Sequence, residues 1–160
     1  MSKNHVEIDS KEVIKMLVGL DQKLRNQAYR NGIRYSLNIV KKETIKNLRA
    51  RLGSASSRKK DKYGKNLEQG VKIMIYRDQK GGNVNLFGNY KTKWFEQGTG
   101  PRYNNQRKTR FLLLKKKRYT GQIKPLHFFY DAYTSKEREV FSTLEKNIAN
   151  AIQKINNKEK

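Results

Sequence analysis

The sequence contains no cysteine, so neither a disulfide framework nor a metal site built on thiolates can form. Long hydrophobic runs are absent too: the longest, at 111–114, falls far short of the roughly 20 residues that a membrane-spanning helix needs. The first 15 residues lack the apolar stretch of a secretory signal. We therefore expect a protein that is made and used in a reducing cytoplasm and does not contact a membrane.

Acidic residues are scarce, with 14 Asp and Glu against 37 Lys and Arg, which gives a net charge of +23. A charge this large favours polyanions or acidic protein surfaces as partners. A codon bias toward Lys and Asn would produce the same composition on a solvated surface. Hydrophobic residues make up 35% of the chain, below the typical value of about 45–50%, so the core must be modest. The length predicts one domain over residues 1–160.

Apolar residues recur at helical spacing near both ends of the chain. A first helix is expected to start at Asp9 or Ser10, with a break near Gly19, and a second, long helix to end near Leu52-Gly53. Another helix is predicted from Leu126 onward. The three stripes are Val13, Leu17, Leu20 and Leu24; Ile33, Leu37, Val40, Thr44 and Leu48; and Phe129, Tyr133, Val140, Leu144, Ile148, Ile152 and Ile155.

The middle of the chain is β-like. Val71, Ile73 and Ile75 alternate with other residues, as in a half-buried strand. A turn signal at 80–83 and a return strand at 84–87 predict a hairpin over residues 70–87. The order helix, hairpin, basic loop, helix predicts an α+β fold, in which a small antiparallel β-sheet packs against a long N-terminal helix and a C-terminal helix.

Residues 53–66 and 102–120 lack periodicity and are expected to form mobile basic loops, while the termini, 1–8 and 156–160, are expected to fray. Within the second loop, residues 110–114 could pair as a short strand. Basic residues beside aromatic ones can neutralise phosphates and stack on bases, but they also form solvated charge runs that prevent aggregation. The candidate contact residues of this loop are Arg102, Arg107, Lys108, Arg110, Lys115, Lys116, Lys117 and Arg118.

Features that indicate catalysis are weak. His127 and Asp131 are spaced to share one helical face, yet no motif ties a Ser or Cys nucleophile to them. The acidic residues are too few and scattered for a two-metal nuclease cluster, and no glycine has the context of a P-loop. No motif for sequence-specific nucleic-acid recognition accompanies the basic loop. We therefore expect a protein that is not an enzyme and needs neither a cofactor nor a metal.

Residues 94–100, WFEQGTG, resemble the aromatic-x-E-x-G-T signature of the phage tail-completion family, also called head–tail joining or neck proteins. The order of elements is similar to that family over residues 10–155, and includes a proline-aromatic stretch at 124–129 followed by Ala132. Two features depart from the pattern. Residues 53–56 replace the proline and Thr-Gly pair that often follow the long helix, and the basic loop carries more charge than is usual.

The resemblance implies a structural virion protein without catalytic residues, assembled in the host cytoplasm into a homo-oligomeric ring, commonly a hexamer. Its partners would be other phage neck and tail proteins, or DNA passing through the junction, and its basic loops would make the contacts. The motif turn, Glu96, Gly98, Thr99 and Gly100, is expected chiefly to determine the fold and otherwise to serve an interface. Glu96 would accept backbone N–H groups of the following turn, and the glycines would permit positive φ or close approach.

Two other functions stay open at this point. A nucleic-acid-binding protein without sequence specificity would fit the charge equally well. A basic nuclease or toxin is the third reading, but no catalytic set supports it.

Overall fold

The computed structural model describes residues 5–9, 22–78, 81–104 and 118–156. The predicted helix start at Ser10, the first apolar stripe up to Leu20, the break at Gly19 and the strand at 110–114 lie outside these residues, as do 157–160. The described elements are β1 (His5–Asp9), α2 (Gln22–Leu52), α3 (Ser54–Arg58), the 3₁₀ turn η1 (Glu68–Gly70), β2 (Lys72–Ile75), β3 (Gly81–Asn85), α4 (Tyr90–Gln97), β4 (Arg102–Asn104), β5 (Arg118–Gly121) and α5 (Phe128–Asn156).

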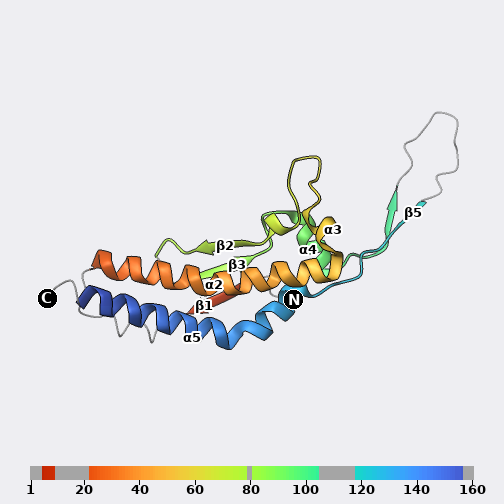
Figure 1. Cartoon of the computed structure of the whole chain (residues 1–160). Coiled ribbons are helices and arrows are strands. Elements are labelled where there is room, and N and C mark those ends of the chain that lie inside the picture. Colours follow the sequence, from red (N-terminus) through yellow and green to blue (C-terminus); the bar gives the residue numbers. More distant parts are fainter. Residues whose placement is uncertain (1–4, 10–21, 79–80, 105–117, 157–160) are drawn as a thin grey trace.

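The two long helices, α2 and α5, lie side by side and antiparallel, and they give the molecule its elongated shape (Figure 1). Gly32 on α2 packs against Ile148 on α5. Toward the other end, the Asn47 amide donates to the Phe128 carbonyl at 3.3 Å. The predicted α+β architecture is therefore confirmed, with one long helix in each half of the chain.

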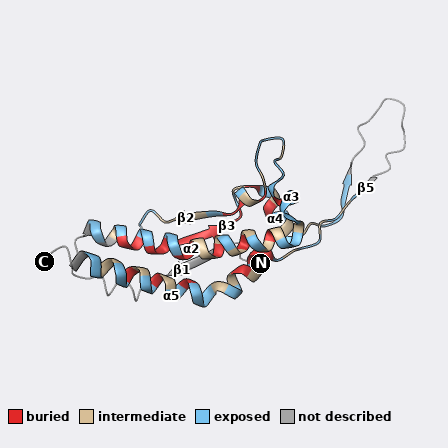
Figure 2. Ribbon diagram, in the orientation of Figure 1, coloured by how far each residue is buried: buried red, intermediate tan, exposed pale blue. Residues whose placement is uncertain are grey.

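The apolar stripes of both helices face the core, as their spacing predicted (Figure 2). Within the stripes, Leu24 is exposed and the side chain of Ile155 lies outside the described part of the chain. The buried members are Ile33, Leu37, Val40, Thr44 and Leu48 on α2, and Phe129, Val140, Leu144 and Ile148 on α5, with Tyr133 and Ile152 partly buried.

Helix α2 ends where the sequence predicted. Gly53 adopts a φ of 79°, which side chains with a Cβ disfavour, and its N–H donates to the Arg49 carbonyl at 2.8 Å. The next residues correct the prediction of an uninterrupted loop over 53–66, because Ser54–Arg58 form the short helix α3. The Ser57 hydroxyl is buried and donates to Glu68 at 2.9 Å, which gives this short helix a fixed partner.

A three-stranded antiparallel sheet, in the order β1-β3-β2, packs on α2. Val84 in the central strand pairs with Val6 on one side and Ile73 on the other. Strand β1 corrects the prediction that residues 1–8 fray, since His5–Asp9 pair along their length with β3. Asp9 accordingly belongs to a strand, and the helix that it was expected to cap lies outside the described residues. Val6 and Ile8 alternate with polar residues, a period-two signal that could have revealed this strand.

Strand β3 corrects the predicted turn at residues 80–83. Gly81, Gly82 and Asn83 are part of the strand, which extends to Asn85, so the return strand is shifted from its expected position at 84–87. A Cβ on Gly82 would lie 2.9 Å from Cδ1 of Leu37 and 2.8 Å from the Met74 carbonyl oxygen. The glycine therefore lets the strand approach α2 closely. Strand β2 agrees with the prediction, with Ile73 and Ile75 partly buried.

Helices α3 and α4 lie at one end of the helix pair, and the β4–β5 hairpin projects away from that end (Figure 1). Among the described helices, none is both long and apolar enough to span a bilayer.

Candidate functional site

Helix α4, which contains the aromatic part of the motif, is held at its start by the preceding loop. The Asn89 side chain accepts the Lys91 N–H at 3.1 Å, as expected of an N-cap. The buried Thr92 hydroxyl donates to the Leu67 carbonyl at 2.9 Å. Residues 90–95 are therefore helical. The sequence alone was compatible with either a short helix or an extended segment there.

Glu96 lies near the end of α4 and is 3% exposed. Its carboxylate oxygens accept the backbone N–H groups of Phe129, at 2.8 Å, and Tyr130, at 3.1 Å. The first N–H groups of a helix have no partner within that helix, and the helix dipole favours a negative charge there. Glu96 therefore caps the start of α5 from a different helix.

This partner corrects the expectation for Glu96. The carboxylate accepts backbone N–H groups, as predicted, but those of α5 and not those of the turn that follows α4. In that turn, the Thr99 N–H donates instead to the Ile123 carbonyl at 2.9 Å. The Ile123 N–H in return donates to the Thr99 hydroxyl at 3.1 Å.

Gly98 makes this arrangement possible, whereas Gly100 does not contribute as expected. Gly98 adopts a φ of 75°, and a Cβ there would lie 2.9 Å from the Ile123 carbonyl oxygen and from the Pro125 ring. Gly100 has neither a positive φ nor a neighbouring atom within 4 Å. Of the two glycines of the motif, only Gly98 is required by the local geometry.

Further backbone bonds join the same two segments. The Leu126 N–H donates to the Phe95 carbonyl at 2.9 Å, and the His127 N–H donates to the Glu96 carbonyl at 3.3 Å. The motif and the proline-aromatic stretch, far apart in the sequence, thus form one connection between α4 and α5. We call it the α4–α5 joint, comprising residues 95–99 and 123–130.

The chain between the two halves of the joint contains residues 102–121, called the basic arm below. Strands β4 and β5 pair at its base, so the loop predicted over 102–120 begins and ends with paired strands. Tyr103 and Tyr119 face each other with ring centroids 5.6 Å apart, and both are more than half exposed. The arm therefore presents aromatic surface directly beside its basic residues.

The predicted contact residues fall into two groups. Arg102 and Arg118 lie on the paired strands, where Arg102 is opposite Gly121 and Arg118 is opposite Asn104. The other six, Arg107, Lys108, Arg110, Lys115, Lys116 and Lys117, lie outside the described residues.

The pairing of His127 with Asp131, considered from the sequence, does not occur. The Asp131 carboxylate instead forms an ion pair with Arg51 on α2. His127 is exposed and adopts a φ of 50° at the start of α5. In the described part of the chain, no three His, Asp or Glu side chains are grouped so that they could hold a metal ion.

One surface was not predicted from the sequence. Tyr90 and Trp94, one helical turn apart on α4, pack edge to face with centroids 5.0 Å apart and remain 54% and 41% exposed. The basic run at 58–65, RKKDKYGK, lies next to α4, and Lys91 reaches Asp61 at 3.3 Å. The basic run is visible in the sequence and could have suggested a charged surface. The sequence alone could not show that it lies beside α4 and its aromatic rings.

Comparison with known protein families, with curated proteins and with solved structures finds no match.

Proposed function

We propose that this chain is a structural subunit of the phage head–tail junction, a neck or tail-completion protein that assembles as a ring and docks neighbouring subunits through the basic arm. One observation carries the proposal. The motif that resembles the tail-completion family forms the α4–α5 joint, and strands β4 and β5, the base of the basic arm, project from this joint away from the core (Figure 1).

The α4–α5 joint provides a fixed attachment for the basic arm. Glu96, Gly98 and Thr99 fix both ends of the arm to the rest of the protein through buried or backbone bonds. The arm's tyrosines stay exposed, so their apolar surface is available to a partner. Tyrosine is enriched in protein interfaces because it combines apolar area with a polar group.

A ring also requires that each subunit use two different surfaces, one for each neighbour. The arm supplies one of them, and the body of the helix pair supplies the other. Ordering of the arm against a neighbour costs conformational entropy, which binding must offset. The charge of +23 favours neighbours that carry acidic surfaces, or DNA in the channel of the ring.

A nucleic-acid-binding protein that acts outside the virion is the alternative. The same charge favours it, together with the exposed aromatic pairs at Tyr103–Tyr119 and Tyr90–Trp94. The two functions differ in where the protein is found.

Particle composition distinguishes the two functions. Phage particles purified by density gradient should contain this chain in a small, fixed copy number, measured by quantitative mass spectrometry against a capsid protein of known copy number. A reconstruction of the junction should then place it as a ring. Particles that lack the chain while the infected cell contains it in free form would rule out the neck assignment.

A further inference from the structure

Two clefts adjoin one another on the side of the molecule that carries the sheet and α3. The first, with a volume of about 620 Å³, lies between α2 and β2 and is lined by Lys41, Lys65 and Lys72 among others. The second, of about 240 Å³, lies between α3 and α4, and its lysines are Lys59, Lys60, Lys65 and Lys91. Lys65 lines both, so the two clefts adjoin at this residue, and we call them together the lysine cleft.

The acidic residues of the lysine cleft are already engaged. Glu68 accepts two bonds from the Arg49 guanidinium, at 2.9 and 2.7 Å, and lies 3.4 Å from Arg58. The Arg49 bonds are the main reason that the pKa of Glu68 lies below its ordinary value. Asp61 accepts the backbone N–H groups of Lys65 and Tyr63 and pairs with Lys91.

The remaining lysines keep their charge uncompensated. Within the described residues, no carboxylate forms an ion pair with Lys41, Lys59, Lys60, Lys65 or Lys72. Several unpaired cations in one concave surface attract an anionic ligand with several charges. A single small anion would neutralise only part of this charge.

Exposed aromatic rings lie next in the chain to residues that line the lysine cleft: Tyr63 precedes Gly64, Tyr90 precedes Lys91 and Trp94 precedes Phe95. Lys91 lies 5.8 Å from the centroid of the Tyr90 ring, and Tyr90 in turn packs on Trp94. On the other side, Lys62 lies 4.8 Å from the Tyr63 ring, which is 65% exposed. Cations in a cleft with exposed rings beside them match a ligand that carries both phosphates and flat bases.

We propose that the lysine cleft binds a single-stranded nucleic acid, with phosphates on its lysines and bases on Trp94, Tyr90 and Tyr63. A second copy of this chain is a poor ligand, since its 14 acidic residues are spread along a sequence of net charge +23. A single strand exposes bases that can stack on the rings, whereas a duplex keeps its bases paired and stacked on one another. The inference is independent of the neck assignment, because it concerns surfaces outside the basic arm.

Trp94 allows a direct test, since it is the chain's single tryptophan. We expect an unlabelled 20-residue oligothymidine to quench Trp94 emission, because a base stacks on the indole. A polyglutamate peptide of the same length should leave the emission unchanged. Equal quenching by both, or none by the oligonucleotide at concentrations that saturate binding, would overturn the proposal.

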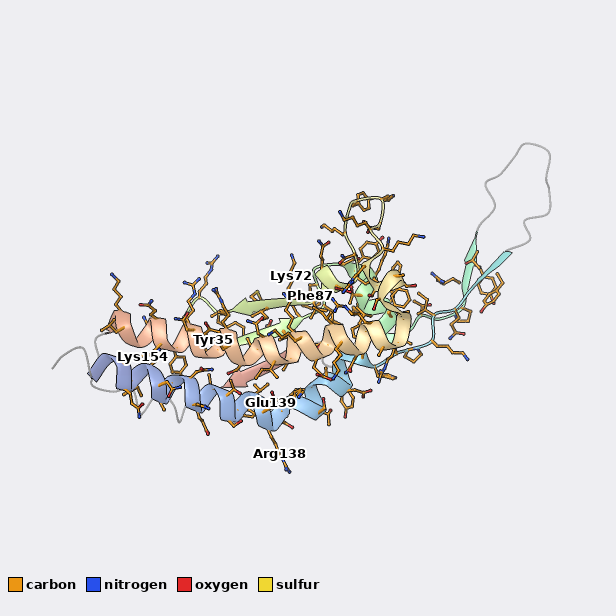
Figure 3. All side chains as sticks on the ribbon, in the orientation of Figure 1. Tyr35, Lys72, Phe87, Arg138, Glu139 and Lys154 are labelled. Atoms are coloured by element: carbon orange, nitrogen blue, oxygen red, sulfur yellow. The ribbon has the colours of Figure 1, made fainter. Side chains whose placement is uncertain are left out.

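Two variants of equal charge then locate the site. Lys41, Lys65 and Lys72 are changed to Gln in one, and Arg138, Lys146 and Lys154 in the other. The control residues are exposed on α5. Arg138 projects from the side of the molecule opposite Lys72, and Lys154 lies near the far end of α5 (Figure 3). Both variants lose three positive charges, so their long-range fields change by similar amounts.

Binding of a fluorescent oligothymidine is measured by anisotropy between 50 and 300 mM salt. If each lysine contacts one phosphate, the cleft variant should bind about 100-fold more weakly near 0.1 M salt. The negative slope of log K against log salt should become shallower by about 2. The control variant should lose less than about tenfold. Equal losses in both variants would mean that binding follows net charge alone and that the lysine cleft is not the site.

Two further measurements keep the result interpretable. Thermal unfolding of both variants should stay close to that of the unmodified chain, since five of the six residues are exposed and Lys41 is partly exposed. Tyr90→Ala should weaken oligothymidine binding about tenfold, in the range found when a stacking ring is removed, without changing the salt slope. An unchanged affinity in Tyr90→Ala, or a duplex bound more tightly than the single strand, would contradict stacking at this site.

Discussion

At the scale of single residues, Glu96 determines where α5 begins. Its two oxygens accept two N–H groups that the helix itself cannot satisfy, and the carboxylate is buried while it does so. Among the described residues, no other side chain accepts a hydrogen bond from these two N–H groups. The position is consequently sensitive to a change that preserves shape but alters hydrogen-bonding groups.

Glu96→Gln should lower the free energy of unfolding by about 1–3 kcal/mol, because the amide NH₂ group cannot accept the second N–H and the favourable charge at the helix start is lost. Urea unfolding followed by circular dichroism measures the loss. Glu145→Gln, a change at an exposed position of α5, is the matched control and should be close to neutral. If the Glu96→Gln variant is as stable as the parent, Glu96 does not stabilise the protein by capping α5.

The sequence predicted the type of interaction that single residues make, but not their partners. Glu96 was expected to accept backbone N–H groups, and it does so. Its actual donors, Phe129 and Tyr130, lie in another helix, and no local pattern specifies such a pairing. For the same reason Gly82 looked like a turn residue, whereas its closeness to Leu37 across the fold makes it part of a strand.

At the scale of elements, α2 and α3 are joined to η1 through Glu68. Arg49, Ser57 and Arg58 all contact its carboxylate, and the Arg49 bonds chiefly lower its pKa below the ordinary value of 4.5. A carboxylate whose pKa is depressed in the folded state stabilises the protein above its unfolded-state pKa. That contribution disappears as the pH falls through about 4.5 and below.

Glu68→Gln should therefore lower the melting temperature at pH 7, and its difference from the parent should shrink as the pH falls from about 5 to 3. Thermal unfolding at a series of pH values measures both quantities. Glu139→Gln, which removes the exposed partner of Lys136, should show little difference at any pH. A constant difference between Glu68→Gln and the parent over this range would show that the Glu68 charge is not responsible.

The contact between α2 and α5 dominates the core, and its central residues are fully buried. Leu37→Ala and Leu144→Ala should each cost about 2–5 kcal/mol, because each leaves a cavity in the packed interface. Met74→Ala, at a half-exposed position of β2, serves as the control and should cost much less. Chemical denaturation gives all three values. Near-neutral results at both leucines would mean that the assigned helical faces are wrong.

Elements with long, regular periodicity were predicted well, and short ones were not. The stripes on α2 and α5 recur over many turns, so single irregularities such as Gly32 do not obscure them. Strand β1 offers only Val6 and Ile8 as its apolar pattern, and its pairing with β3 depends on residues far along the chain. Helix α3 consists of small polar residues, which locally favour a loop, and is fixed by Glu68.

At the scale of the whole molecule, the described base of the basic arm, strands β4 and β5, contributes no residue to the packed core. Replacing Lys115, Lys116, Lys117 and Arg118 with Ser should leave the melting temperature unchanged but impair assembly. The reason is that this segment continues from β5, which lies outside the core, and is proposed to contact neighbouring subunits. Thermal unfolding and the yield of complete particles, with the variant supplied in place of the parent chain, measure the two effects. A large loss of thermal stability would instead place this segment in the core.

The order of elements along the chain also has a consequence for synthesis. Strand β3 lies between β1 and β2, so one edge of the central strand is completed by residues near the start of the chain. Part of the apolar face of α2 is covered by α5, which is translated after every other described element. A nascent chain that ends before residue 128 therefore lacks the helix that covers this part of α2, although β2 and β3 can already pack on the helix. The packing of α2 is accordingly completed only once α5 has been synthesised.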